Sequence, residues 1–234
     1  MTGIPREERL IVALDLPTPR EAQALVDKLA GAARFYKVGL ELFSTEGCFE
    51  LIRWLAARGN KVFADLKLFD IPETVRRATA NLSRSGASFL TVHAHPSLLS
   101  AAAAEKGAMK ILGVTVLTSF DQGDLAEMGA TKTLEALVTD RALATAEAGC
   151  DGVIASPHEA RKLKDRFGGR LLVVTPGIRP AEASKADQKR TMDVAQAFAA
   201  GADYIVVGRP IRDAADPRVA AEAIQKTISG IFNK

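Results

Sequence analysis

Residues 61–75 read KVFADLKLFDIPETV and combine an apolar strand with two charges on one of its faces. The run 61–68 is predicted to be a strand, and the amphipathic stretch 74–86 behind it is predicted to be a helix. Side chains two positions apart on a strand point to the same side, so Asp65 and Lys67 share a face. Because burying unpaired charge is costly, this face requires an explanation beyond packing.

The same succession of a short apolar run and a longer amphipathic run is repeated along the whole chain. The predicted strands are 10–16, 35–43, 61–68, 89–95, 110–119, 152–156, 171–177 and 204–209. Helical stretches lie between them, such as 19–31, 48–59, 74–86 and 133–150. Several end at a glycine suited to a left-handed C-cap, namely Gly31, Gly59, Gly86, Gly149 and Gly201.

Eight strand-then-helix units without a linker predict one parallel sheet with helices outside it. Eight is also the number of units that closes a (β/α)8 TIM barrel, so we predict an α/β fold with a single barrel domain over residues 1–234. Periodicity does not prove closure, and a doubly wound open sheet is the alternative. No domain break or tandem motif repeat is visible.

Composition narrows the class of protein. The chain has 234 residues, 47% of them hydrophobic and 25% charged, which is ordinary for a globular protein with a sizeable core. The net charge of +3 is too small to predict binding to nucleic acid or to a membrane, although it suits an anionic small molecule. Cys48 and Cys150 have no ligand-like spacing and are expected to be free thiols. Without an apolar leader or a run long enough to span a membrane, the expected location is the cytoplasm.

Charged residues converge at one end of the first three strands. Strand alternation directs Val12, Leu14 and Leu16 to the outer helices, and likewise Val38, Leu40 and Leu42, then Ala64, Leu66 and Leu68. Asp15, Lys37, Asp65 and Lys67 then point to the barrel axis, with Asp70 just beyond the third strand. A buried salt-bridge network is the structural alternative, but such pairs often stabilise no better than an apolar core. Convergent charges are more typical of an active site.

The last two strands predict a phosphate site. The seventh ends in PGIRP with Gly177 and Arg179, and the eighth ends in GRP with Gly208 and Arg209. Loops after strands seven and eight of this fold often bind phosphate; glycine lets backbone N–H groups approach an anion, and arginine can bind it in bidentate fashion. The alternative is that these glycines form turns and the arginines are surface charges.

Two long connections, 120–131 and 178–191, leave the same ends of the strands and are typical of lids or binding loops. Gln188 in the second is able to close over a ligand. Thr118 and Ser119 could read an amide-like edge or could simply cap a strand. His93 and His95 share a strand face, but without a third ligand in view a metal site is not predicted.

The sequence resembles the orotidine 5'-phosphate decarboxylase family over nearly its whole length. The resemblance rests on these motifs in order: ALDL (13–16), YKVGLELF (36–43), DLKLFDIPET (65–74), TVLTS (115–119), PGIRP (176–180), DQ (187–188) and VGRPI (207–211). It implies the conversion of orotidine 5'-phosphate (OMP) to UMP in pyrimidine biosynthesis, with no metal or organic cofactor.

The resemblance also implies residue roles. Lys67 would protonate C6 of the pyrimidine after carbon dioxide leaves, and Lys37, Asp65 and Asp70 would complete a Lys-Asp-Lys-Asp array. Asp70 and Thr74 would reach into the site of a second copy, which implies a homodimer. The expected substrate contacts are Asp15 and Lys37 to the ribose, Thr118 and Ser119 to the pyrimidine, Gln188 from the closing loop, and Gly208, Arg209 and Arg179 to the phosphate.

Two positions depart from the family pattern. Phe69 and Glu73 stand where the family commonly has His and Asn. Phe69 is expected to point outward and serve packing, whereas Glu73 places a negative charge beside the cross-subunit Thr74. Two rival functions remain. A phosphosugar decarboxylase or aldolase would use magnesium on a carboxylate pair such as Glu41 and Asp65, and a non-catalytic barrel would only bind nucleotides.

Overall fold

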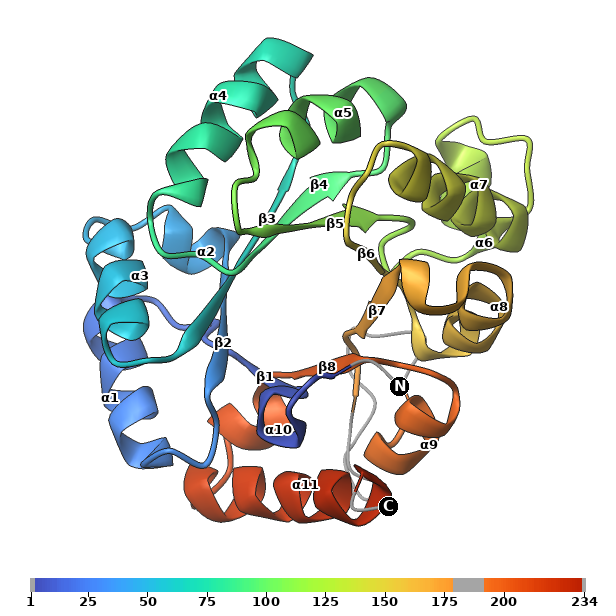
Figure 1. The fold of residues 1–234 in the computed structure, drawn as a ribbon. Helices are drawn as coiled ribbons and strands as arrows, with labels where there is room; N and C mark the ends of the chain where they lie inside the picture. The colour runs from blue at the N-terminus through green and yellow to red at the C-terminus, as the bar shows by residue number, and fades with distance from the viewer. Residues whose placement is uncertain (1–2, 179–191, 233–234) are drawn as a thin grey trace.

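The predicted strands form a parallel sheet that closes on itself. The structure is a computed structural model that describes residues 3–178 and 192–232. Its strands are β1 (Leu10–Ala13), β2 (Phe35–Gly39), β3 (Lys61–Leu68), β4 (Phe89–His93), β5 (Lys110–Val114), β6 (Gly152–Ile154), β7 (Leu172–Thr175) and β8 (Tyr204–Val207). They pair in chain order, and β1 pairs with β8 to complete the barrel (Figure 1). The prediction of a single-domain (β/α)8 barrel is confirmed.

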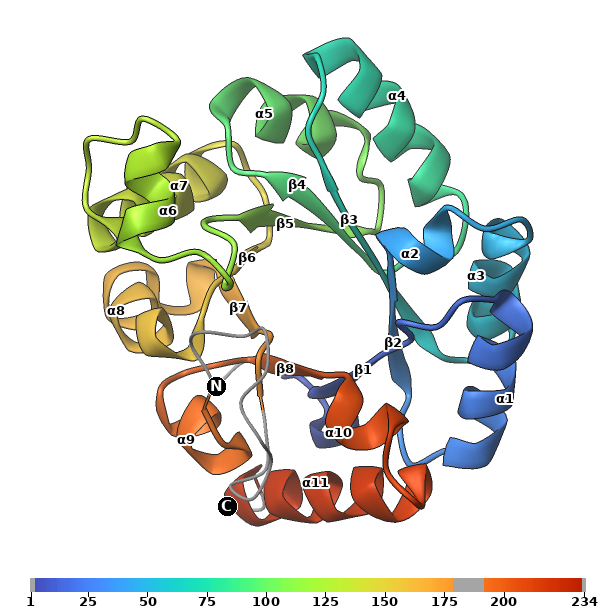
Figure 2. The ribbon, with the colours of Figure 1, turned by 180° about the vertical axis from the view of Figure 1, so that it is seen from behind.

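Helices surround the barrel on its outer side, as both views show (Figures 1 and 2). They are α1 (Pro19–Leu29), α2 (Leu40–Phe43), α3 (Cys48–Ala57), α4 (Pro72–Ser83), α5 (Pro96–Glu105), α6 (Gln122–Glu127), α7 (Leu134–Glu147), α8 (Pro157–Phe167), α9 (Val194–Ala199), α10 (Arg209–Arg212) and α11 (Pro217–Phe232). Two short 3-10 turns, η1 (Arg6–Glu8) and η2 (Gly168–Arg170), lie before β1 and β7.

Local sequence explains where the helices begin and end. Thr18 begins α1 by accepting a hydrogen bond from the Glu21 backbone N–H, with Pro19 in the first turn. All five glycines predicted as C-caps have positive φ angles, from 75° at Gly59 and Gly149 to 103° at Gly201. A side chain is disfavoured in that conformation, so these glycines mark where the helices end.

Strand alternation divides the apolar residues into two layers. Leu10, Val12 and Leu14 pack outward with helix residues such as Leu25. The inward residues form a separate cluster inside the barrel, which includes Ile11, Ala13, Phe35, Phe63, Phe89, Leu112, Val174 and Tyr204. The predicted assignment of inner and outer faces is therefore confirmed for β1.

Aromatic rings fill the amino-terminal half of the barrel. Phe35 and Phe89 meet edge to face with ring centroids 4.8 Å apart, and Tyr204 contacts both at 5.8 and 5.2 Å. Phe63 joins the group through Phe89 at 6.0 Å. Edge-to-face pairs are favourable beyond the area that they bury. These four rings, which we call the aromatic floor, close the barrel beneath the site described below.

The second strand is shorter than predicted, and the assignment of Leu40 to an outward, packed strand position is wrong. The strand ends at Gly39, and α2 follows at once. Leu40 is 59% exposed whereas Leu42 is fully buried, although both would lie on one face of a strand. The helical turn separates them, and the alternation pattern in LELF cannot distinguish the two conformations over so few residues.

The long connection after β5, expected to be a lid or binding loop, contains the short helix α6. Asp121 and Asp124 form a capping box at its start, so the loop carries its own helix signal. Of the connection 178–191, only Ile178 lies among the described residues. Within residues 3–178 and 192–232, the helices are all too short or too polar to cross a membrane.

Candidate active site

A cavity of about 510 Å3 opens at the carboxyl ends of the strands. This size is typical of a small-molecule site, and in TIM barrels this end of the sheet carries the active site. The predicted site residues that line it are Asp15, Lys37, Asp65, Lys67, Thr118, Ser119, Gly208 and Arg209. Residues that are far apart in sequence are thus gathered around one space.

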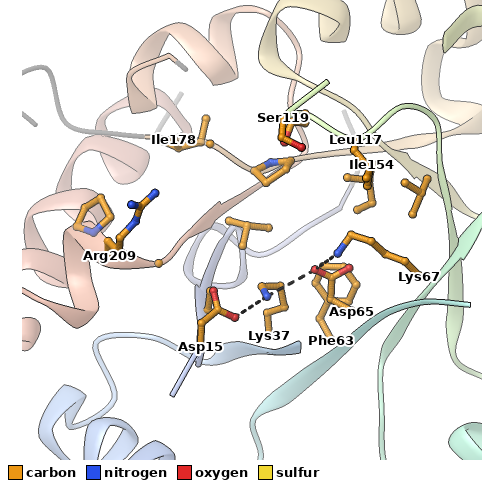
Figure 3. Close-up of a pocket in the computed structure, with 18 of the residues that line it drawn as sticks. Asp15, Lys37, Phe63, Asp65, Lys67, Leu117, Ser119, Ile154, Ile178 and Arg209 are labelled. Carbon is orange, nitrogen blue, oxygen red and sulfur yellow. Dashed lines mark hydrogen bonds and ion pairs between the residues drawn. The ribbon is translucent and has the colours of Figure 1, made fainter. Parts of the chain in front are cut away.

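Four charged side chains, from β2, from β3 and from the residues just after β1, form a continuous row (Figure 3). The Lys37 ammonium lies 2.8 Å from one Asp15 oxygen and 3.5 Å from Oδ2 of Asp65. The Lys67 ammonium lies 2.9 Å from the same Asp65 oxygen. One carboxylate oxygen therefore faces two ammonium groups.

Burial and pairing hold the centre of this row in its charged form. The side chains of Lys37 and Asp65 are only 11% and 12% exposed. Burial alone would lower the pKa of Lys37, but the Asp65 and Asp15 carboxylates outweigh it and raise that pKa. Burial would likewise raise the pKa of Asp65, but Lys37 and Lys67 lower it. Both groups stay ionised over a wide range around neutral pH.

A bulge in β3 sets the direction of Lys67. Ala64 pairs with Leu90 and Leu68 pairs with Val92, so three residues of β3 stand opposite one residue of β4. Lys67 takes up the irregularity with a φ of 47°, a left-handed conformation that costs a residue with a side chain roughly 1–2 kcal/mol. Bulges often re-aim side chains beside active sites.

Thr91 is the residue of β4 that stands opposite the bulge. Its Oγ1 donates a hydrogen bond to Oδ1 of Asp65 at 2.9 Å and accepts one from the Lys67 backbone N–H, also at 2.9 Å. The sequence reasoning missed this residue. The sequence does indicate that Thr91 points inward, because it lies between Phe89 and His93 on the inner face of β4.

Gly39 is a second residue that the sequence reasoning missed. A Cβ at this position would lie 2.9 Å from Nζ of Lys37 and 3.2 Å from Oδ1 of Asp15. The φ of Gly39 is −94°, so its backbone does not require glycine. The missing side chain instead leaves room for the Asp15–Lys37 pair.

The predicted phosphate end lies across the cavity from Lys67 (Figure 3). Gly208 and Arg209 line it at the junction of β8 and α10, and Gly177 lines it after β7. Arg212, not predicted from the sequence, also lines the cavity and donates from Nη1 to the Asp15 backbone carbonyl at 2.6 Å. Arg179 and Gln188 lie outside the described residues.

Thr118 and Ser119 lie in the loop after β5 rather than at a strand end, because that strand stops at Val114. Both line the cavity. The alternative that they cap a strand is therefore not supported by their positions.

Residues 8–224 match the family described as "Orotidine 5'-phosphate decarboxylase / HUMPS family". The chain belongs to this family. Residues that carry the sequence resemblance, including the Lys37, Asp65 and Lys67 positions, thus lie within the matched region. The family predicted from the sequence is confirmed.

Relatives cover nearly the full chain. An orotidine 5'-phosphate decarboxylase of Methylococcus capsulatus is 54% identical over 98% of this chain and 95% of its own length. One of Rhodopseudomonas palustris is 51% identical over 97% of this chain and 96% of its own length. The crystal structure of the Lactobacillus acidophilus orotidine 5'-phosphate decarboxylase superposes with a TM-score of 0.84 at 37% identity, covering 94% of this chain and 99% of that one.

The family residues Asp70 and Thr74 do not line the main cavity of this chain. They border a separate hollow of about 300 Å3 between the end of β3 and α4. The Asp70 side chain is exposed and accepts a hydrogen bond from the Ile71 backbone N–H at 2.6 Å. Within one chain, the row of charges therefore consists of Asp15, Lys37, Asp65 and Lys67.

The first departure from the family pattern, Phe69, is not packed as predicted. Its side chain is 73% exposed, with an edge contact to the His93 ring at 5.2 Å between centroids. In an unbroken strand, residue 69 would share the inward face of Asp65 and Lys67, so the outward assignment does not follow from alternation and is wrong. In addition, β3 ends at Leu68, one residue before Phe69. Phe69 lies instead on the surface beyond the strand.

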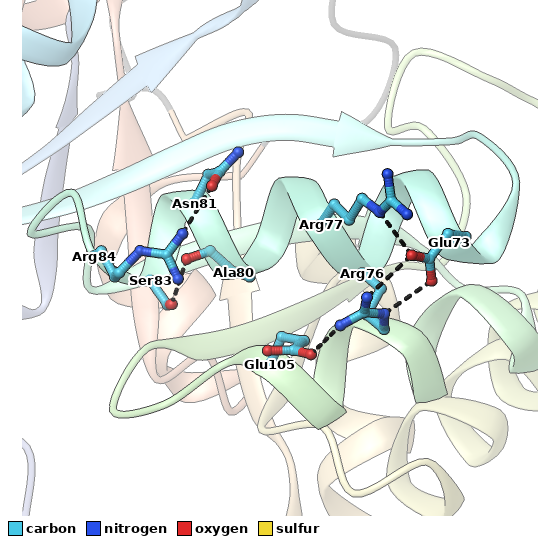
Figure 4. A network of polar contacts seen from close by, with 8 residues as sticks. All are labelled: Glu73, Arg76, Arg77, Ala80, Asn81, Ser83, Arg84 and Glu105. Atoms are coloured by element: carbon cyan, nitrogen blue, oxygen red, sulfur yellow. Dashed lines mark hydrogen bonds and ion pairs between the residues drawn. The ribbon is translucent and has the colours of Figure 1, made fainter.

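The second departure, Glu73, does not leave an unpaired charge beside Thr74. Glu73 forms ion pairs with Arg76 at 2.9 Å and Arg77 at 2.6 Å, and Arg76 continues to Glu105 of α5 (Figure 4). Hydrogen bonds from Arg76 and Arg77 lower the pKa of Glu73 to about 2. The extra negative charge is balanced on α4 itself.

Within the part of the chain that the structure describes, candidate metal ligands are not brought together. Among the described residues, no three His, Cys, Asp or Glu side chains are grouped in a way that could hold a metal ion. His95 begins α5 and contacts Ser97, whereas His93 contacts Phe69. Glu41 is exposed at the start of α2 and does not line the cavity with Asp65.

Proposed function

We propose that this chain converts OMP to UMP and carbon dioxide, and that the charges around Asp65 perform the reaction. The chain is an enzyme, a carboxy-lyase of the family identified above. The observation that carries the proposal is the pair of ammonium groups, from Lys37 and Lys67, on one buried carboxylate inside the cavity. A scaffold gains little from such an arrangement, whereas cations already fixed in place stabilise a reaction that develops negative charge.

The reaction breaks the bond between C6 of the pyrimidine and its carboxylate. The bonding electron pair stays on C6, in an orbital that cannot delocalise into the ring, and carbon dioxide leaves. Lys67 then gives a proton to C6 and becomes a neutral amine. An ammonium already fixed beside C6 stabilises the developing charge without reorganisation of solvent.

Several electrostatic contributions are required. Opposite charges about 4 Å apart interact by about 4 kcal/mol at an effective dielectric of about 20, whereas enzymes lower barriers by roughly 8–23 kcal/mol. Lys67 as proton donor, with Lys37, Asp65 and Asp70 as the remaining array, supplies more than one such interaction. Binding of the remote phosphate adds energy that orders the reacting ring.

The remaining contacts follow the length of the cavity. Asp15 and Lys37 bind the ribose, and Thr118 and Ser119 bind the pyrimidine. Arg209 and Gly208 bind the 5'-phosphate together with Arg179, and Gln188 closes from the loop. The placement of Arg209 opposite Lys67 supports this direction of binding, because it separates the phosphate from the reacting carbon.

A homodimer completes the site in this proposal, with Asp70 and Thr74 of each chain entering the partner's cavity. Two exposed apolar side chains that flank Asp70 support it, since Phe69 and Ile71 are 73% and 66% exposed. Clustered exposed apolar groups mark interaction surfaces. The cytoplasmic location stays a prediction.

The deciding experiment follows the absorbance of OMP in the presence of EDTA. We expect the absorbance to fall as UMP forms, and EDTA to make no difference. Asp65 is already paired with two ammonium groups and Glu41 is outside the cavity, so these two carboxylates are not placed to hold magnesium. Turnover of an open-chain sugar phosphate that stops with EDTA would favour the phosphosugar alternative. Binding of UMP without any turnover of OMP would favour a nucleotide-binding barrel.

A further inference from the structure

Thr91 occupies an unusual place behind the charged row. It is fully buried, at 0% exposure, and points inward from β4, directly opposite the bulge of β3. The cavity wall is formed by Asp65 and Lys67 in front of it. Thr91 is thus placed to act on these two residues rather than on a substrate.

One hydroxyl joins the two residues that flank the bulge. It donates to Oδ1 of Asp65 and accepts from the backbone N–H of Lys67, each at 2.9 Å. A hydroxyl has one hydrogen to donate. Here that hydrogen goes to Asp65, and the oxygen accepts from the Lys67 backbone. Threonine is stiff at χ1, which holds the oxygen between its two partners.

This bond also fixes the orientation of the Asp65 carboxylate. With Oδ1 held by Thr91, the other oxygen, Oδ2, faces Lys37 at 3.5 Å and Lys67 at 2.9 Å. Rotation of the carboxylate would break the Thr91 bond and both ion pairs together. The same hydroxyl supports the left-handed backbone of Lys67, at φ 47°.

We propose that Thr91 is the positioning residue of the charged row, whose hydroxyl sets both the rotation of the Asp65 carboxylate and the direction of Lys67. This inference rests on the proposed function for its effect on catalysis. It assigns no contact with substrate to Thr91. Reacting groups that are misplaced by about 1 Å can lose roughly 100-fold in rate.

The test compares three substitutions of buried threonines. Thr91→Val removes the hydroxyl at nearly constant shape, and Thr91→Ser keeps the hydroxyl. Thr79→Val is the matched control, because Thr79 is also 0% exposed but its hydroxyl has no hydrogen-bond partner among the described residues.

We expect Thr91→Val to lower kcat for OMP by about 10- to 100-fold with little change in KM. Thr91→Ser should stay within about threefold of the parent chain, and Thr79→Val should match it, since neither removes the bond to Asp65. An unchanged kcat in Thr91→Val would overturn the proposal. Equal losses in Thr91→Val and Thr91→Ser, or in Thr91→Val and Thr79→Val, would also overturn it, because they would indicate packing alone.

A second measurement does not depend on turnover. In 13C NMR titrations of aspartate-labelled protein, with Asp65→Asn to assign the signal, Thr91→Val should raise the pKa of the Asp65 carboxyl because a hydrogen bond to the carboxylate is lost. Thr91→Ser should leave it unchanged. If the parent chain did not decarboxylate OMP, the proposed function would fail and this titration would still decide the role of Thr91. Should Thr91→Val not fold, Thr91→Ala with Thr79→Ala as control replaces it.

Discussion

At the scale of single residues, Lys67 combines a charge on an inward strand position with a backbone that strands do not normally adopt. Its φ of 47° and its ion pair with Asp65 occur at the same bulge. Strained conformations persist only where the surroundings impose them. Here the Thr91 hydrogen bond and the β3–β4 pairing do so.

Replacement of Lys67 by alanine should abolish decarboxylation and leave substantial binding of UMP. The proton donor is lost, whereas the phosphate and ribose contacts lie elsewhere in the cavity. Turnover of OMP and calorimetric binding of UMP measure the two effects. Lys61→Ala is the control, because Lys61 starts the same strand and is ion-paired with Glu8 away from the cavity. Measurable turnover by Lys67→Ala close to that of the control would contradict the proposed donor.

Gly39→Ala should lower kcat/KM for OMP by about 10- to 100-fold without unfolding the protein. Its Cβ would lie 2.9 Å from the Lys37 ammonium, which has to move. Gly230→Ala in α11 is the control, since a Cβ there meets no atom within 4 Å. Steady-state kinetics and thermal unfolding separate activity from stability. Equal kinetics in the two variants would show that Lys37 tolerates the displacement.

The charged residues were predictable from sequence, but the residues that arrange them were not. Asp15, Lys37, Asp65 and Lys67 are identified by strand alternation, which is a local property. Thr91 and Gly39 act through neighbours on other strands, Thr91 opposite β3 and Gly39 beside Asp15. Those contacts depend on strand register and on the bulge, which a local pattern does not specify.

At the scale of elements, the order of strands and helices followed from periodicity, whereas the ends of strands did not. Apolar runs continue beyond the hydrogen-bonded sheet into loops that remain buried, as after β1 and β5. The predicted boundaries at Leu16 and Ser119 are therefore too late. The same limitation concealed α2, whose four residues fit strand and helix patterns equally well.

The start of α4 predicts a stability effect that depends on pH. Glu73→Gln should be less stable than the parent chain at pH 7, because the ion pairs with Arg76 and Arg77 are lost. The folded-state pKa of Glu73 is lowered from 4.5 to about 2, so its contribution is present above pH 4.5 and is lost as pH falls toward 2.

Urea unfolding of both proteins between pH 7 and pH 2 measures this effect. The difference between them should be small, because the pairs are exposed, and should shrink further in high salt. It should close as the pH falls below 4.5. A difference that stays constant across this range would contradict the assigned pairing.

The junction of β8 and α10 predicts a separate effect on substrate affinity. Arg209→Ala should raise KM for OMP by about 10- to 100-fold, because a charge-assisted hydrogen bond to phosphate is lost. Arg218→Ala is the control, as Arg218 pairs with Glu222 on the surface of α11. Unchanged UMP affinity in Arg209→Ala would count against the phosphate assignment.

At the scale of the whole molecule, eight repeated units predicted the barrel, but closure required the pairing of β1 with β8. That contact joins strands almost the full length of the chain apart, and periodicity carries no information on it. The proposed roles of Asp70 and Thr74 depend on contacts with a second chain, which periodicity does not specify either.

Mixing two inactive variants tests this shared site. Lys67→Ala and Asp70→Ala chains, each inactive alone, should recover part of the activity when combined, because one of the two sites in a heterodimer then carries both residues. Recovered turnover in isolated heterodimers, with each homodimer as control, is the measurement. Heterodimers that form and remain inactive would contradict a site completed by Asp70 of the partner.

The aromatic floor lies beneath the cavity, which opens at the carboxyl ends of the strands. Phe35, Phe63, Phe89 and Tyr204 pack against one another in the buried cluster inside the barrel, and the interior of a TIM barrel is a packed core rather than a pore. Under the proposed reaction, UMP and carbon dioxide therefore leave through the same opening by which OMP enters. A molecule bound at this opening would therefore block substrate entry and product release together. The next OMP can bind only after UMP has left.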